Sequence, residues 1–259
     1  MGILQADTGN FLLGRMASDD YALIERYIHR IELPVRFQLH EAGRTINEMY
    51  FPESGVVSIV AVTHDGNACE VGLFGREGMS ETATLMGTDC SPHEAYVQVA
   101  GTSALKLSTK VMSEALTKSS TMRLHLLKYV QAMMVQLSTS IVASGQTIDQ
   151  RLARWLLMCH DRSDGDALPL TQEFIGMMLG VRRAGVTDAM AMLRNDGLVK
   201  QQRGTITIID RRGLEQRAEG GYGLAEAEYE RLMGVALRRA PNASRALISG
   251  QTTKYAKHV

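Results

Sequence analysis

The stretch Leu168–Leu198 reads LPLTQEFIGMMLGVRRAGVTDAMAMLRNDGL and predicts two short helices joined by a tight turn. Thr171 is a good N-cap for the first helix, because its hydroxyl can accept a hydrogen bond from a free N–H of the first turn. Apolar residues follow at helical spacing, namely Phe174, Ile175, Met178 and Leu179. Gly180 tolerates the backbone angles of a sharp turn, so we expect the first helix to end there.

A second helix is expected from about Arg182 to Arg194. Its apolar positions are Val186, Met190 and Leu193, and the opposite face carries Arg182, Arg183 and Thr187. A short helix, a glycine turn and a second helix with arginines at its start form the helix-turn-helix pattern, whose second helix enters the major groove of DNA. The sequence therefore predicts DNA contacts by these three polar residues.

A hairpin follows the two helices. Residues Leu198–Asp210 (LVKQQRGTITIID) alternate between apolar and polar on either side of Arg203-Gly204. A helix-turn-helix followed by a hairpin is the winged variant. Arg203 at the tip is a candidate for a phosphate contact, and the alternative is a solvated turn residue.

Composition limits the classes of protein and site. The 259 residues suggest one or two domains, and Lys+Arg and Asp+Glu balance at 28 each. Binding of DNA must therefore depend on a local basic patch. The three cysteines Cys69, Cys90 and Cys159 are not clustered, which argues against a disulfide framework, an iron–sulfur cluster or structural zinc. We find no membrane-length apolar run and no secretion signal, and we expect a cytoplasmic protein with no membrane partner.

The N-terminal part predicts a β-sandwich or jelly-roll barrel. Residues 1–17 carry no clear pattern and are expected to form a loosely packed leader, and a helix should begin at Ser18-Asp19-Asp20. The expected strands are Ile31–Leu39, Glu48–Phe51, Val56–Thr63, Ala68–Phe74, Ala95–Ala100 and Ser103–Leu107. His64-Asp65-Gly66-Asn67 has the composition of a tight hairpin turn.

A long helix is expected over 121–144, and its apolar residues repeat every seven positions. The repeats are Leu127, Met134 and Ile141, and Val130 and Leu137. This narrow seam favours a parallel dimer through a partner helix. The alternative is a long helix packed on its own β-domain.

A further helix, Ile148–His160, should point Leu152, Trp155, Leu156 and Cys159 inward and open the C-terminal domain. The predicted fold class is thus α+β. We divide the chain into a β-roll sensory domain (1–110), a long dimerisation helix (111–147), a winged helix-turn-helix domain (148–215) and a helical extension with a basic tail (216–259).

Several ordered motifs resemble the Crp/Fnr family of bacterial transcription regulators. They are YFPESGVVSIV (Tyr50–Val60), EVGLFGREGM (Glu70–Met79), RLARWLL (Arg151–Leu157) and TQEFIGMMLGVRRAGVTDAMAML at 171–193. The resemblance covers roughly residues 20–215. It implies a homodimer that binds a pseudo-palindromic operator in double-stranded DNA, a sensory domain that modulates this binding, and an effect on RNA polymerase.

The resemblance also implies roles for single residues. The family's major-groove arginine falls on Arg183, which could bind guanine O6 and N7 with both arms. Arg182 and Thr171 match positions that meet phosphate. Ala184 and Asp188 depart from the better-known recognition pattern, so the operator should differ from the best-known consensus.

The family's phosphate cassette is degenerate in this chain. Its two parts correspond to Gly75–Met79 and Pro92–Ala95, where His93 replaces the key arginine and Glu94 replaces a small hydroxyl residue. A carboxylate repels phosphate, so we do not expect binding of cyclic AMP. Arg76 and Glu77 complete a candidate effector pocket with His93 and Glu94. The alternative is that Arg76 and Glu94 are surface groups or members of ion pairs.

The leading prediction is a DNA-binding transcription regulator whose effector is unknown. The alternative is a small-ligand-binding sensor module whose helix-turn-helix mediates protein contacts, which Asp188 on the recognition face favours. We expect neither a cofactor nor a metal, because the histidines show no ligand-like pairing. An enzyme is not expected either, since the sequence contains no nucleophile–base pair and no phosphate-cradling glycine loop.

Overall fold

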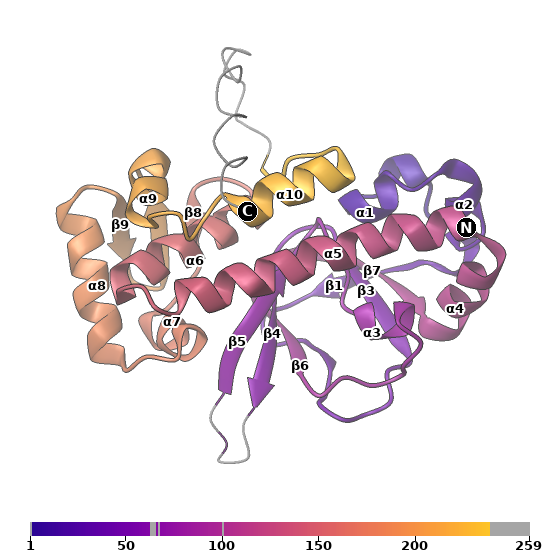
Figure 1. Cartoon of the computed structure of the whole chain (residues 1–259), viewed down its shortest axis with the longest axis horizontal. Coiled ribbons are helices and arrows are strands. Elements are labelled where there is room, and N and C mark those ends of the chain that lie inside the picture. The colour runs from indigo at the N-terminus through magenta and orange to yellow at the C-terminus, as the bar shows by residue number, and fades with distance from the viewer. Residues whose placement is uncertain (1, 63–65, 67, 100, 239–259) are drawn as a thin grey trace, which may run out of the picture.

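The computed structural model describes residues 2–62, 66, 68–99 and 101–238. An N-terminal half rich in strands and a C-terminal half rich in helices lie side by side along one long helix, α5 (Figure 1). The N-terminal strands are β1 (His29–Leu33), β2 (Gln38–His40), β3 (Glu48–Pro52), β4 (Val56–Val62), β5 (Ala68–Phe74), β6 (Glu94–Val99) and β7 (Gly101–Ser108). The predicted α+β class is confirmed.

Two antiparallel sheets form the N-terminal half. One has the strand order β2-β6-β4-β5 and the other the order β1-β7-β3. The expected single strand Ile31–Leu39 is wrong, because the chain turns between β1 and β2. Pro34 has no N–H for a ladder, and Arg36 takes a left-handed φ of 67°. The turn expected at His64–Asn67 involves His64, Asp65 and Asn67, which lie outside the described residues.

The helices before the C-terminal half are short, except for one. They are η1 (Gln5–Asp7), α1 (Phe11–Gly14), α2 (Ser18–Ala22), η2 (Glu25–Tyr27), α3 (Thr82–Leu85), α4 (Thr109–Lys118) and α5 (Ser120–Ala143). Among the described residues, no helix is both long and apolar enough to cross a membrane.

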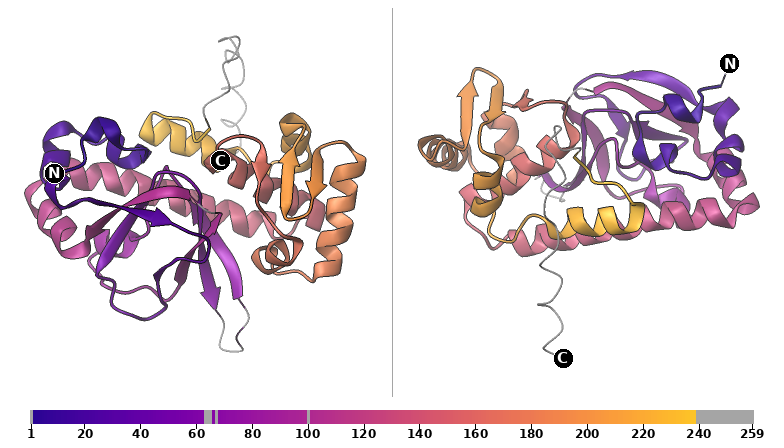
Figure 2. Two further views of the ribbon diagram at one scale, coloured as in Figure 1. Left: turned by 180° about the vertical axis from the view of Figure 1, so that it is seen from behind. Right: turned by 90° about the horizontal axis from the view of Figure 1, so that it is seen from above.

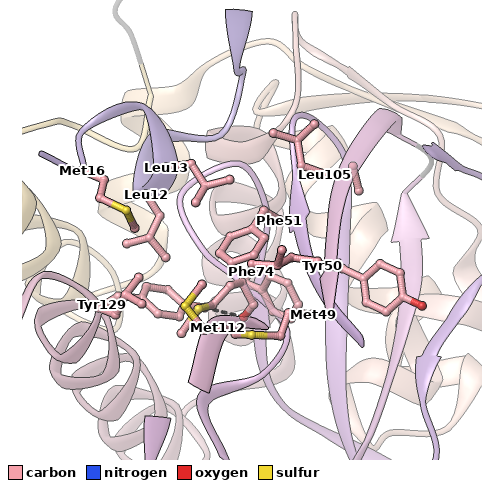
Figure 3. Packing of buried hydrophobic residues seen from close by; sticks show 14 of the residues in the cluster. Leu12, Leu13, Met16, Met49, Tyr50, Phe51, Phe74, Leu105, Met112 and Tyr129 are labelled. Atoms are coloured by element: carbon pink, nitrogen blue, oxygen red, sulfur yellow. Dashed lines mark hydrogen bonds between the residues drawn. The ribbon is translucent and has the colours of Figure 1, made fainter. Parts of the chain in front are cut away.

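The first residues of the chain belong to the core, which corrects the expected loose leader. Leu12 and Leu13 of α1 are fully buried, and Figure 3 shows them next to Phe51. The Asn10 side chain accepts a hydrogen bond from Leu13 N at 3.1 Å and donates one to Pro52 O at 2.9 Å. This polar anchor fixes α1 on β3, and no periodic pattern in so short a segment revealed it.

The C-terminal half packs helices around a three-stranded sheet of order β8-β10-β9. Its elements are α6 (Ile148–Arg162), β8 (Ala167–Leu168), α7 (Gln172–Leu179), α8 (Arg183–Asn195), β9 (Val199–Gln202), β10 (Thr205–Ile208), α9 (Arg211–Arg217) and α10 (Leu224–Met233). The inward residues predicted for α6, including Trp155 and Cys159, are buried.

The last helix, α10, returns to the N-terminal half and lies against α5 (Figures 1 and 2). Tyr229 and Met233 are buried in the N-terminal core, whereas Leu224 at the start of α10 is 65% exposed. Arg238 is bound to Asp166 at 3.0 Å. The rest of the predicted basic tail, residues 239–259, lies outside the described residues.

A candidate nucleic-acid interface and an apolar cleft

The helix-turn-helix is formed by α7 and α8. The hydroxyl of Thr171 caps α7 by accepting a hydrogen bond from Phe174 N at 3.4 Å. Gly180 ends α7 with a φ of +63°, a left-handed conformation that favours glycine. Gly176 allows a close approach, because a Cβ there would lie only 3.1 Å from the Val181 carbonyl oxygen. These contacts fix the angle of the turn.

The second helix, α8, presents a polar face outward. Its buried residues are Val186, Ala189, Met190 and Leu193. Arg182, its N-cap residue, and Arg183, its first residue, are both exposed. Within the described part of the chain, neither guanidinium has a hydrogen-bond or ion-pair partner. Two free cations at a helix N-terminus, with its own partial positive charge, favour an anion such as phosphate.

The other predicted contact residues are also exposed. The Thr187 hydroxyl donates a hydrogen bond to the carbonyl of Arg183 at 3.0 Å, and its oxygen also lies 3.3 Å from Gln172 Oε1, at the start of α7. Arg203 lies between β9 and β10, beside Gly204 with its φ of +71°. Among the described residues Arg203 has no charged partner, so its side chain is available to a ligand.

Two arginines that the sequence did not single out, the buried Arg154 and the partly exposed Arg217, hold this half together. Arg154 on α6 donates to the Gly221 carbonyl at 2.8 Å and to Ser140 Oγ on α5 at 3.0 Å. Arg217 on α9 pairs with Asp149 on α6 at 2.9 Å. Because these partners are distant in the sequence, no local pattern could have identified them.

The four residues of the predicted effector pocket do not come together, which corrects that expectation. Arg76 pairs with Asp164 at 2.6 Å, as the ion-pair alternative allowed. Glu77 accepts from Arg162 at 2.7 Å and is buried. Both therefore join the β-roll to the end of α6. Of the four, only His93 lines the cleft described next, and Glu94 begins β6 outside it.

An apolar cleft of about 450 Å³ lies between the β-roll and α5. Ile59, Val71 and Ala83 line it from the β-roll side, and Met133 and Leu137 line it from α5. A buried pair sits in its wall, with His40 Nδ1 at 2.7 Å from Glu81 Oε1. The sequence analysis missed this pair because the two residues are 41 positions apart.

A second carboxylate of the cleft connects it to the helical half. Glu70 on β5 lines the cleft and accepts a hydrogen bond from Trp155 Nε1 on α6 at 2.9 Å. It also accepts one from Ser58 Oγ at 2.5 Å. Burial raises the pKa of Glu70 to about 7, against the opposing effect of these two hydrogen bonds. The protonation of this group therefore changes close to neutral pH.

Residues 150–217 match the model of the Crp-like helix-turn-helix domain. This part of the chain is a Crp-like helix-turn-helix domain. No curated protein matches the chain. The match begins inside α6 and ends with α9, so it covers the two helices and the wing that the sequence predicted.

Solved structures extend the likeness to the whole fold. FixK2 from Bradyrhizobium japonicum is 15% identical, with a TM-score of 0.62 over 73% of this chain and 96% of its own. A transcriptional regulator of the Crp/Fnr family from Eubacterium rectale is 17% identical, with a TM-score of 0.59 over 81% of this chain and 98% of its own. A regulator of the CRP family from Thermus thermophilus is 20% identical, with a TM-score of 0.58 over 73% of this chain and 96% of its own. The predicted Crp/Fnr resemblance is confirmed in fold and in the helix-turn-helix domain.

In this Crp/Fnr fold, α5 leaves an apolar stripe exposed. The stripe consists of Leu124, Leu127, Met134, Ile141 and Val142, whose exposed fractions range from 37% to 75%. Val130 and Leu137 of the predicted seam are instead half-buried, and Leu137 packs against the chain's own core. The seam therefore divides into an outward row and an inward row.

Proposed function

We propose that this protein is a homodimeric transcription regulator that binds a pseudo-palindromic operator through α8. The observation that carries the proposal is the pair of exposed, unpartnered guanidiniums of Arg182 and Arg183 at the start of α8 in the described structure. They belong to a Crp-like helix-turn-helix domain. The proposed parts are the β-roll sensory domain (1–110), the dimerisation helix (111–147), the DNA-binding domain (148–215) and the C-terminal extension (216–259).

Each proposed contact has its own role. Arg183 reads a guanine edge in the major groove, a contact worth about 1–3 kcal/mol in discrimination. Arg182 and Thr171 bind phosphate and set the register of the helix. Thr187 faces the same groove, and Arg203 on the wing tip binds the flanking phosphate backbone. The bound dimer would then recruit or block RNA polymerase.

The dimer forms through the α5 stripe. A row of large apolar side chains along one exposed face of a 24-residue helix matches the seam of a two-helix coiled coil. Leu127, Met134 and Ile141 form the repeating row, with Leu124 and Val142 at its ends. The half-buried Val130 and Leu137 flank this row, and Leu137 packs within its own protomer.

The test is selection of genomic fragments by the purified, full-length protein, compared with Arg183→Ala. We expect a palindromic motif that is enriched by the native protein and lost in the variant. Arg44→Ala is the matched control, because Arg44 is an exposed arginine of the β-roll, 79% exposed and paired only loosely with Glu41 at 3.8 Å. Equal enrichment by the native protein and Arg183→Ala would overturn the role of α8.

The second candidate function is a ligand sensor whose helix-turn-helix mediates protein contacts. Its support is Asp188, which is exposed on α8 and would repel a phosphate backbone. Binding to sheared genomic DNA at low and high salt separates the two functions. A regulator loses affinity steeply as salt rises, because binding releases counterions. A protein-contact module shows little affinity for DNA at either salt concentration.

A further inference from the structure

We propose that residues 221–238 form a strap that fixes the helix-turn-helix half against the β-roll half, and that this strap sets the distance between the two α8 helices of the dimer. The strap follows α9 and lies outside the matched domain, which ends at residue 217. It contains α10, which leaves the C-terminal half and lies along α5 (Figures 1 and 2). The second part of the proposal rests on the proposed function, whereas the first part does not.

The first end of the strap is tied to α6. The carbonyl of Gly221 accepts a hydrogen bond from Arg154 Nε at 2.8 Å. The hydroxyl of Tyr222 donates to Asp161 Oδ2 at 2.7 Å and accepts from Arg211 Nη2 at 2.5 Å. Arg154 and Asp161 are only 8% and 3% exposed. Because hydrogen bonds to charged groups are stronger than those between neutral groups, this end is held firmly on α6.

The middle of the strap enters the core of the β-roll half. Tyr229, Met233 and Leu237 belong to the N-terminal hydrophobic core, where they are 3%, 7% and 8% exposed. The hydroxyl of Tyr229 also donates to the carbonyl of Glu77 at 2.9 Å, in the loop after β5. Three large buried side chains and one buried hydrogen bond therefore hold this part of the strap on the β-roll half.

The far end of the strap returns to the end of α6. Arg238 Nη1 donates to the carbonyl of His160 at 2.6 Å, and Nη2 donates to Asp166 Oδ1 at 3.0 Å. The ring of His160 also contacts Arg211, with 3.1 Å between Nδ1 and Nη1. Arg211 thus lies beside both ends of the strap. The two ends are tied to the helix-turn-helix half at one place, and the middle is tied to the β-roll half.

This arrangement restricts rotation of one half against the other. The chain connects the halves through the short loop between α5 and α6, residues 144–147, and a single loop of this kind acts as a joint. The strap is a second connection, and it adds to the direct contact of Arg162 with Glu77. A rotation would have to break the contacts at the middle of the strap or those at both of its ends.

A fixed orientation has a consequence for the choice of operator. In a dimer of helix-turn-helix proteins, the distance between the two recognition helices sets the spacing of the half-sites. The proposed dimer is joined through α5, so a helix-turn-helix half that cannot rotate against α5 presents α8 at one distance. We therefore expect the protein to accept a narrow range of half-site spacings.

A double variant releases both ends of the strap. Tyr222→Phe/Arg238→Met removes the side-chain hydrogen bonds of the two ends and leaves the buried middle unchanged. Tyr27→Phe/Arg231→Met is the matched control, because Tyr27 is 38% exposed and the side chain of Arg231 is 67% exposed. Their hydrogen bonds join residues that are one and three positions apart in the chain. Each single variant, Tyr222→Phe or Arg238→Met, should show a smaller change than the double variant.

The first measurement requires no DNA. Spin labels on Cys90 of the β-roll half and on Arg212→Cys of α9 report the distance between the halves by double electron–electron resonance. Cys69→Ser removes the other exposed thiol, and Cys159 is buried. Labelled protein is mixed with an excess of unlabelled protein, so that only distances within one protomer are read. We expect one narrow distance in the native and control proteins and a broader distribution in the double variant.

The second measurement uses the operator recovered by fragment selection. Its half-sites are moved one or two base pairs closer together or further apart, and binding is followed by fluorescence anisotropy. We expect the native protein to lose affinity steeply with each change. The double variant should discriminate among the spacings about tenfold less, because the lost hydrogen bonds to charged groups no longer resist rotation.

The strap is overturned if the double variant has the same distance distribution as the native protein, or if the control broadens as much as the double variant. Its role in the choice of operator is overturned if the native protein and the double variant discriminate equally among the spacings. If the native protein binds no DNA, the proposed function fails and this role fails with it. The distance measurement still decides whether the strap holds the two halves together.

Discussion

The Nε atom of Arg162, the last residue of α6, lies 2.7 Å from Oε1 of Glu77 in the loop after β5. Both side chains are almost fully buried, at 1% and 4% exposure. Burial lowers the pKa of Arg162, but the carboxylates of Glu77 and, less strongly, Asp161 outweigh this effect and hold the pKa above its ordinary value. A buried charge pair therefore joins the β-roll half to the helix-turn-helix half.

Removal of one partner of this pair should strongly destabilise the protein. We expect Arg162→Ala to lower the free energy of unfolding by about 3–5 kcal/mol, because Glu77 is left buried without a cation. Chemical denaturation measures this loss. Asp164→Asn is the control, since Asp164 is 76% exposed in its pair with Arg76 and should contribute about 1 kcal/mol or less. Equal losses of unfolding free energy in the two variants would show that the buried pair stabilises the protein no more than the exposed pair does.

The fluorescence of Trp155 should report the titration of Glu70. Trp155 is the single tryptophan of the chain, and its Nε1 donates to Glu70. Burial raises the pKa of Glu70 to about 7, so the emission should change with a midpoint near pH 7. Glu70→Gln should remove this transition, whereas Glu94→Gln, outside the cleft, should retain it. A transition that survives Glu70→Gln would assign it to another group.

The same titration has a consequence for stability. The pKa of Glu70 rises from 4.5 to about 7 on folding, so the folded protein holds this proton more tightly. The stabilisation of the folded state by this tighter proton binding is complete below pH 4.5 and is lost as the pH rises through about 7. The contribution is at most about 3 kcal/mol. Thermal unfolding should show that Glu70→Gln gains stability relative to the native protein between pH 5 and 8, and a constant difference would contradict the shifted pKa.

Charge in the α5 stripe should dissociate the proposed dimer. Met134 is 60% exposed in the described chain, and Met134→Glu would place a carboxylate in the apolar seam of both protomers. We expect the dissociation constant to rise by roughly 100-fold or more, as measured by sedimentation equilibrium. Met86→Glu makes the same change at a methionine that is 64% exposed outside α5, and it should leave the dimer intact. If neither variant dissociates the dimer, the dimer interface lies outside the α5 stripe.

Arg203 should contribute to DNA affinity without contributing to sequence preference. Because its proposed partner is phosphate, Arg203→Ala should weaken binding about equally for all sequences. It should also reduce the slope of log K against log salt by about 1. Titrations of operator and unrelated DNA at several salt concentrations give both quantities. A loss confined to the operator would instead indicate that Arg203 reads a base.

The helix α10 should stabilise the N-terminal core from outside the matched helix-turn-helix domain. Tyr229 is 3% exposed, and its hydroxyl donates to the Glu77 carbonyl at 2.9 Å. Tyr229→Ala should cost about 3–5 kcal/mol, the usual cost of truncating a large buried aromatic side chain. Leu224→Ala, at a 65% exposed position of the same helix, should change stability by about 0.5 kcal/mol or less. Similar small effects in both variants would show that α10 packs loosely.

Local sequence patterns correctly predicted the helices, turn and hairpin of the helix-turn-helix half. Thr171, Gly180 and the apolar spacing of α8 act between neighbours in the chain, and the structure has the helices and turn that they predict. The hairpin around Arg203-Gly204 is local in the same sense. The expectation of a loosely packed leader over residues 1–17 was wrong. Helix α1 is buried by contacts with β3, and its sequence has no periodicity that would reveal this.

The sequence by itself determined the winged helix-turn-helix and the arginines at the start of its second helix, α8. Only the tertiary structure decided that Glu77 meets Arg162, 85 positions away, and that His40 meets Glu81 beside an apolar cleft. It also decided which row of α5 remains exposed. The physical reason is that helix and turn preferences act between adjacent residues, whereas burial and charge pairing depend on which distant segments fold together.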